Sequence, residues 1–67
     1  MSVAKVTEII SSSPTSFDDA VANGIARASE TLKGITGAWV SEQKVTVADG
    51  KISEYRVVMR VTFILQD

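Results

Sequence analysis

The side chains of this sequence that could do chemistry are one tryptophan, two arginines near the C-terminus and a set of dispersed carboxylates. Trp39 could serve as an aromatic platform for a planar ring, or it could be an interface anchor that fills a pocket on a neighbouring subunit. Arg56 and Arg60 could hold a phosphate through their guanidinium groups. Alternatively, both arginines pair with a carboxylate such as Glu54 or Glu42, or with one from a neighbour.

Four carboxylates offer oxygen ligands to a hard cation such as calcium, namely Glu8, Glu42, Asp49 and Glu54. Their spacing does not match an EF-hand loop, so a calcium site would need ligands from several chains. Asp18 and Asp19 are explained more simply as favourable charges at the start of a helix. The carboxylates therefore give no sign of acid–base catalysis.

The composition excludes several functional classes. The chain has neither cysteine nor histidine, so it lacks a disulfide, a thiolate nucleophile and an imidazole base, and we expect no enzymatic activity. Seven basic and eight acidic side chains leave no electrostatic footprint for nucleic acid. No run of about 18 apolar residues could span a membrane. The N-terminus lacks a signal-peptide pattern, which favours a cytoplasmic protein.

A strand and one amphipathic helix are predicted for the first half of the chain. Residues 3–11 are rich in β-branched side chains, which favours a strand. Ser16 is placed to cap a helix, with Asp19 as an acidic version of the capping-box residue. Apolar residues then recur at three- and four-residue steps, which predicts a helix over residues 17–33. The predicted stripe consists of Phe17, Val21, Ile25, Ala28 and Leu32.

Two glycines mark the middle and the end of the predicted helix. Gly24 lies in its middle and costs about 1 kcal/mol relative to alanine, which indicates tight packing against a strand rather than a ligand role. Gly34 follows the predicted helix and suits the left-handed conformation found after helix ends.

The second half is predicted to form a long hairpin. Residues 38–48 and 51–66 favour strands, and Asp49-Gly50 between them is typical of a two-residue type I′ turn. Alternate residues of the last strand form an unbroken apolar face, which should be the core that receives the helix: Tyr55, Val57, Met59, Val61, Phe63 and Leu65.

This order of elements predicts an α+β fold with a three-stranded antiparallel sheet. One helix covers only one face of such a sheet, and open edges of about ten residues invite pairing with another copy. A chain near 60 residues is also marginal as a monomer. We therefore expect a single domain, residues 1–67, that forms a homo-oligomer.

The order and spacing of several segments resemble the dodecin family over almost the whole chain. These segments are VAKVTEII from residue 3, SSPTSF from residue 12, ARA from residue 26, TL from residue 31 and EYRVVMRVTF from residue 54. The resemblance implies a β-α-β-β protomer whose sheet wraps around its own helix, in a hollow dodecamer of cubic symmetry. It also implies a flavin-binding storage protein that holds flavins in pairs at subunit interfaces and is no enzyme.

The flavin site of the family maps onto four positions. The stacking tryptophan of the family corresponds to Gly37, while Trp39 lies on the same face about 6.6 Å further along the strand. The family's glutamine at the pyrimidine edge corresponds to Arg56, which donates hydrogen bonds but cannot accept one from a ring N–H. The family's acidic position is kept as Glu42. The candidate ligand-binding residues are therefore Gly37, Trp39, Glu42 and Arg56.

Because two flavin determinants are replaced, the sequence more closely resembles family branches without the stacking tryptophan, some of which bind calcium. The expected function is non-enzymatic binding or storage of a small ligand, with a flavin (riboflavin, FMN or FAD) as the family default. The alternative is a flavin-free assembly protein held by subunit packing or by cations such as calcium.

Overall fold

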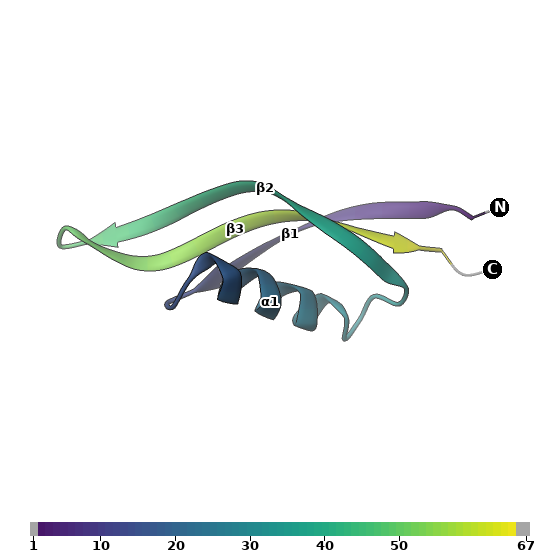
Figure 1. Cartoon of the computed structure of the whole chain (residues 1–67), viewed down its shortest axis with the longest axis horizontal. Coiled ribbons are helices and arrows are strands. Elements are labelled where there is room, and N and C mark those ends of the chain that lie inside the picture. Colours follow the sequence, from purple (N-terminus) through teal and green to yellow (C-terminus); the bar gives the residue numbers. More distant parts are fainter. Residues whose placement is uncertain (1, 66–67) are drawn as a thin grey trace.

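A long three-stranded sheet with one helix against one of its faces forms the structure (Figure 1). The computed structural model describes residues 2–65. In chain order the elements are β1 (Ala4–Ser13), α1 (Phe17–Ala28), β2 (Ile35–Ala48) and β3 (Lys51–Ile64). β3 lies in the centre and pairs antiparallel with both β1 and β2. The predicted α+β class and β-α-β-β order are confirmed.

A hydrogen-bonded turn connects β1 to α1. Ser16 caps the helix as predicted, because its hydroxyl accepts from the backbone N–H of Asp19 at 3.0 Å. The carboxylate of Asp19 does not complete a capping box with Ser16. It accepts instead from the hydroxyl of buried Ser13 at 2.6 Å and from Asn23 at 3.1 Å. The last residue of β1 is thereby tied to the first turns of the helix.

The helix is shorter than the predicted range of residues 17–33, since it ends at Ala28. The hydroxyl of Ser29 donates to the carbonyl of Ile25 at 2.8 Å, and the N–H of Leu32 donates to the carbonyl of Ala28 at 2.9 Å. The N–H groups of Glu30 and Thr31 donate to carbonyls three residues back, those of Arg27 and Ala28, each at 3.2 Å, so the chain tightens into turns after Ser29. Leu32 therefore follows the helix instead of extending its stripe.

The strand boundaries differ from the predictions by a few residues, whereas the turn between β2 and β3 has the predicted geometry. β1 extends two residues beyond its predicted end, and β2 begins three residues earlier than predicted. The predicted end of the last strand at Gln66 lies outside the described residues. Asp49 has a φ of 53° and Gly50 a φ of 75°, the two positive values that a type I′ turn requires. Gly34 is also left-handed, with a φ of 75°.

The core is centred on the middle of β3. Val57, Met59 and Val61 are fully buried, as predicted, and Ala20 of α1 packs in one cluster with Val57 and Met59. The prediction is wrong at the ends of this face, where Leu65 is 45% exposed and Tyr55 and Phe63 are only half-buried. A 12-residue helix is about 18 Å long, whereas a 14-residue strand reaches about 48 Å. One helix therefore cannot cover the whole strand.

Small residues mark the closest contact between α1 and the sheet. Ala20, Gly24 and Ala28 are the buried residues of the helix, and Phe17, Val21 and Ile25 flank them with partly buried side chains. A Cβ placed on Gly24 would lie 2.7 Å from Cε of Met59 and 2.9 Å from Cβ of Ser11. The prediction that Gly24 permits tight packing against a strand is confirmed.

Apolar side chains stay exposed where the helix gives no cover. The end of the β2–β3 hairpin extends beyond α1 (Figure 1) and carries Val47 and Ile52, which are 63% and 51% exposed. Ile10 of β1 is exposed as well. In the part of the chain that the structure describes, no helix is long and apolar enough to cross a membrane.

Candidate functional site

The four predicted site residues share one side of the sheet. This side, here called the helix-free face, is the one that carries Val58 and Arg60 of β3, opposite to Met59 and α1. Gly37 pairs with Thr62 and Trp39 pairs with Arg60, so both lie on the helix-free face, as the two-residue spacing predicted.

The backbone at Gly37 is open to substitution. No atom lies within 4 Å of a Cβ built on this residue, and its φ is not in the left-handed range. The missing side chain leaves a gap beside Trp39 on the same strand and the same face. Trp39 itself is 51% exposed.

A bulge in β2 places Glu42 beside Trp39. Simple alternation would put residues 39 and 42 on opposite faces. The register shifts between Val40 and Glu42, so that Glu42 pairs with Val58, and the hydroxyl of Ser41 donates to the carbonyl of Val58 at 3.1 Å. The extra residue returns Glu42 to the helix-free face.

Arg56 makes its contacts at some distance from Trp39. Its Nε donates to Ser12 Oγ at 3.1 Å, and its Nη2 forms an ion pair with Glu54 Oε1 at 3.1 Å. It lies four residues before Arg60 along β3, which is about 13 Å in an extended strand. A single chain therefore does not bring Arg56 and Trp39 together. The ion pair with Glu54 is one of the pairings predicted as the alternative to a ligand role for Arg56.

Trp39 instead belongs to a row of three side chains across the three strands. The guanidinium carbon of Arg60 lies 5.5 Å from the centroid of the Trp39 ring, a cation–π distance. Nε of Arg60 lies 3.7 Å from Oε2 of Glu8, which is directly opposite on β1. The sequence had suggested Glu54 or Glu42 as intrachain partners for Arg60. Glu8 takes this place because β1 lies beside β3.

The described carboxylates do not form a cation site within a single copy. Among residues 2–65, no group of three acidic side chains lies close enough to hold a metal ion. Two of the four predicted oxygen ligands, Glu8 and Glu54, each contact an arginine.

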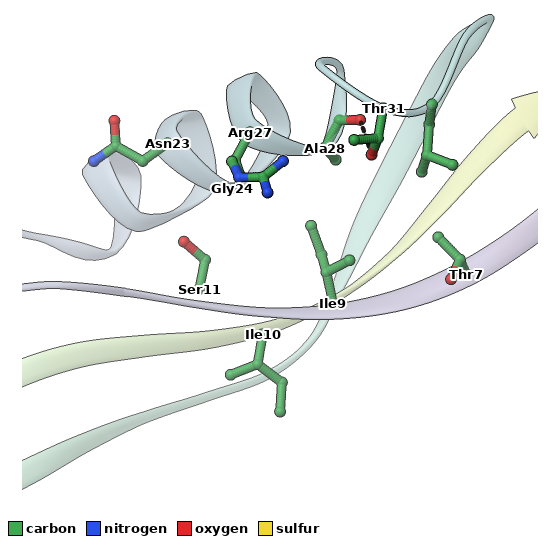
Figure 2. Close-up of a pocket in the computed structure, with 10 residues that line it drawn as sticks. Thr7, Ile9, Ile10, Ser11, Asn23, Gly24, Arg27, Ala28 and Thr31 are labelled. Atoms are coloured by element: carbon green, nitrogen blue, oxygen red, sulfur yellow. Dashed lines mark hydrogen bonds between the residues drawn. The ribbon is translucent and has the colours of Figure 1, made fainter.

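A groove at the edge of β1 is the further feature that the sequence did not predict. It has a volume of about 500 Å³ and lies between α1 and β1. Figure 2 shows Ile9 and Ser11 directed toward the helix and Ile10 directed away from it. The lining residues are Thr7, Ile9, Ile10, Ser11, Asn23, Gly24, Arg27, Ala28, Thr31 and Leu32, and they include none of the predicted site residues.

The Trp39–Arg60 pair could have been found from the sequence, because counting back from the two-residue turn at Asp49-Gly50 places these residues opposite each other. Between this pair and the turn, the observed ladder contains two irregularities, after Val40 and after Thr46, that compensate for one another. The groove had no comparable signal, since its shape depends on where the helix crosses β1.

Comparisons with known proteins match nearly the whole chain to one family. The family model described as Dodecin matches residues 3–66. The calcium dodecin of Mycobacterium tuberculosis is 44% identical over 64 residues, which cover 94% of this chain and 89% of that protein.

Solved structures of proteins from the same family superimpose on this chain. A dodecin from Streptomyces davaonensis superimposes with a TM-score of 0.95 at 38% identity, covering 98% of this chain and 97% of its own. A calcium-chelating immunodominant antigen, calcium dodecin, from M. tuberculosis was solved with a novel calcium-binding site. It has a TM-score of 0.84 at 40% identity and covers 96% of this chain and 91% of its own.

Proposed function

The chain belongs to the dodecin family, and from this we propose that it is a non-enzymatic, oligomeric protein that binds and stores a small ligand at or between its subunits. The observation that carries the proposal is the match to dodecins along nearly the whole chain. It is supported by the gathering of the candidate residues Gly37, Trp39 and Glu42 on the helix-free face.

The proposed assembly is a homododecamer. The helix covers one face only, and apolar residues such as Ile10 and Val47 remain exposed on the single chain. β1 and β2, of 10 and 14 residues, are both edge strands, and long open edges favour pairing with other copies. Association would cover apolar surface that a chain of this size cannot bury alone.

The first candidate ligand is a flavin, the family default. Two features of the site weaken this choice. Gly37 offers no ring at the family's stacking position, and the Nε and Nη2 donors of Arg56 already contact Ser12 and Glu54. A flavin would therefore depend on Trp39 and Glu42, or on contacts from neighbouring subunits.

The second candidate ligand is calcium, which the similarity to the calcium dodecin of M. tuberculosis favours. Because no group of three acidic side chains gathers within residues 2–65, the ion would be shared between copies. Glu42 is a candidate oxygen donor for such a shared site.

Titrations of the purified protein test these proposals. We expect light scattering to give a particle of twelve 7.2 kDa subunits. Riboflavin or FMN is added while the emission of Trp39, the only tryptophan, is followed. Calcium is added to chelator-treated protein in a calorimeter. Flavin binding at micromolar concentration supports flavin storage, and calcium binding with loss of assembly in chelator supports the second candidate. A monomer that binds neither would overturn the proposed function.

Replacing Gly37 with tryptophan should raise flavin affinity. The position is open and needs no left-handed backbone, so the variant should assemble normally. Stacking on an aromatic ring contributes about 0.5–1.5 kcal/mol beyond area burial, which corresponds to between about twofold and tenfold in the dissociation constant. The matched control is Ala38→Trp, which places the same ring on the opposite face of β2. Unchanged affinity in an assembled Gly37→Trp variant would show that the site is aligned wrongly.

A further inference from the structure

We propose that Trp39, Arg60 and Glu8 form a binding platform for a planar aromatic ligand that carries a carboxylate. The inference rests on the proposed small-ligand function and specifies a ligand class for the helix-free face. The three residues lie side by side on β2, β3 and β1, since Arg60 pairs with Trp39 on one side and with Glu8 on the other. The backbone hydrogen bonds of the sheet hold their relative positions.

The indole of Trp39 supplies the apolar surface for the ring. About half of this residue, 51%, is exposed. Gly37, on the same face of β2, leaves an open gap at the side of the indole, because no atom lies within 4 Å of a Cβ built there. A ring larger than the indole can therefore extend over Gly37 while it stacks on Trp39.

The guanidinium of Arg60 supplies the charge selectivity. Its cation lies 5.5 Å from the indole centroid, so a group attached to a stacked ring comes within its reach. Its contact with Glu8 is long, at 3.7 Å, and both side chains are more than half exposed, which makes this ion pair weak. A guanidinium has five N–H donors, and a carboxylate can accept two of them side by side.

The contrast with Arg56 on the same face supports this choice of residue. Arg56 donates through Nε and Nη2 to Ser12 and Glu54, each at 3.1 Å, and only about a third of its side chain is exposed. Arg60 is 51% exposed and lies against an aromatic ring. Arg60 is therefore the arginine that a ligand on Trp39 can reach.

Glu8 weakens the binding of an anionic ligand to the platform. Its carboxylate competes with the carboxylate of the ligand for Arg60 and adds a negative charge beside it. Removing that charge should strengthen the binding of an anionic ligand, whereas a purely structural ion pair would give no such gain.

The test compares 2-naphthoate with its neutral amide by calorimetry on the assembled protein. We expect the acid to bind about tenfold more tightly than the amide, the value of one charged hydrogen-bonding contact. Arg60→Gln should remove this preference, Trp39→Ala should abolish binding of both compounds, and Glu8→Gln should strengthen binding of the acid. Lys44→Gln is the matched control, because it removes a positive charge from the same face four residue pairs away along the sheet and should leave the preference intact.

Three results would overturn the inference. The first is equal binding of acid and amide by the unchanged protein. The second is an equal loss of the preference for the acid in Arg60→Gln and Lys44→Gln. The third is tryptophan emission that acrylamide cannot quench because another copy covers the indole. Riboflavin and calcium titrations on the same sample separate this failure from that of the proposed function. If either ligand binds while naphthoate shows no preference, only the aromatic-acid platform is rejected.

Discussion

Replacing Met59 with alanine is expected to lower the free energy of unfolding by about 2–5 kcal/mol. Met59 is fully buried, with 0% exposure to solvent, and it packs in the cluster with Ala20 and Val57. Truncation removes a buried methylene, the thioether sulfur and the terminal methyl group and leaves a cavity between the helix and β3, and both effects destabilise the fold. The measurement is denaturant unfolding at one fixed subunit concentration, because association contributes to apparent stability.

The matched control for this prediction is Met59→Leu. This replacement keeps the volume of the buried side chain nearly unchanged, so it should cost less than about 1.5 kcal/mol. A Met59→Ala protein that unfolds at the same denaturant concentration as the unchanged chain would contradict the position of the core.

Replacing Gly24 with valine is expected to cost about 2–3 kcal/mol through overpacking. The first added carbon would lie 2.7 Å from Cε of Met59 and 2.9 Å from Cβ of Ser11. The methyl end of Met59 can swing aside, but Cβ of Ser11 is bonded directly to the backbone of β1. The helix must therefore move away from the strand, which loosens the contacts of the core.

Two further variants isolate the steric origin of this cost. Ala22→Val adds the same side chain at an exposed helix position and should cost only about 0.6 kcal/mol of helix propensity. In a Met59→Ala background, the valine at position 24 has room to enter the cavity, so its cost should fall. Equal costs of Gly24→Val and Ala22→Val would mean that α1 does not approach the sheet as closely as described.

Much of the fold could be predicted from local patterns. The Asp49-Gly50 turn, the cap at Ser16 and the buried centre of β3 follow from rules that need only neighbouring residues, and the structure confirms all three. The helix end was predicted wrongly because the apolar spacing continues to Leu32 after the helix has stopped. After Ser29, the backbone N–H groups of Glu30 and Thr31 bond to carbonyls three residues back, and this tightened turn ends the helix before the apolar periodicity ends.

The candidate site was predicted in part. Period-two spacing along β2 is sufficient to place Gly37 and Trp39 on one face. The position of Glu42 required the bulge after Val40, and the pairing of Arg60 with Glu8 required β1 to lie beside β3.

The sequence by itself therefore determined which elements form, which side of β3 is buried and which family the chain resembles, because periodicity, turn chemistry and residue order are properties of consecutive residues. Only the tertiary structure decided that Glu8, Arg60 and Trp39 form one row and that a groove opens between α1 and β1. These features depend on strand order, register shifts and the path of a helix across a sheet, and such contacts join residues that are far apart in the chain.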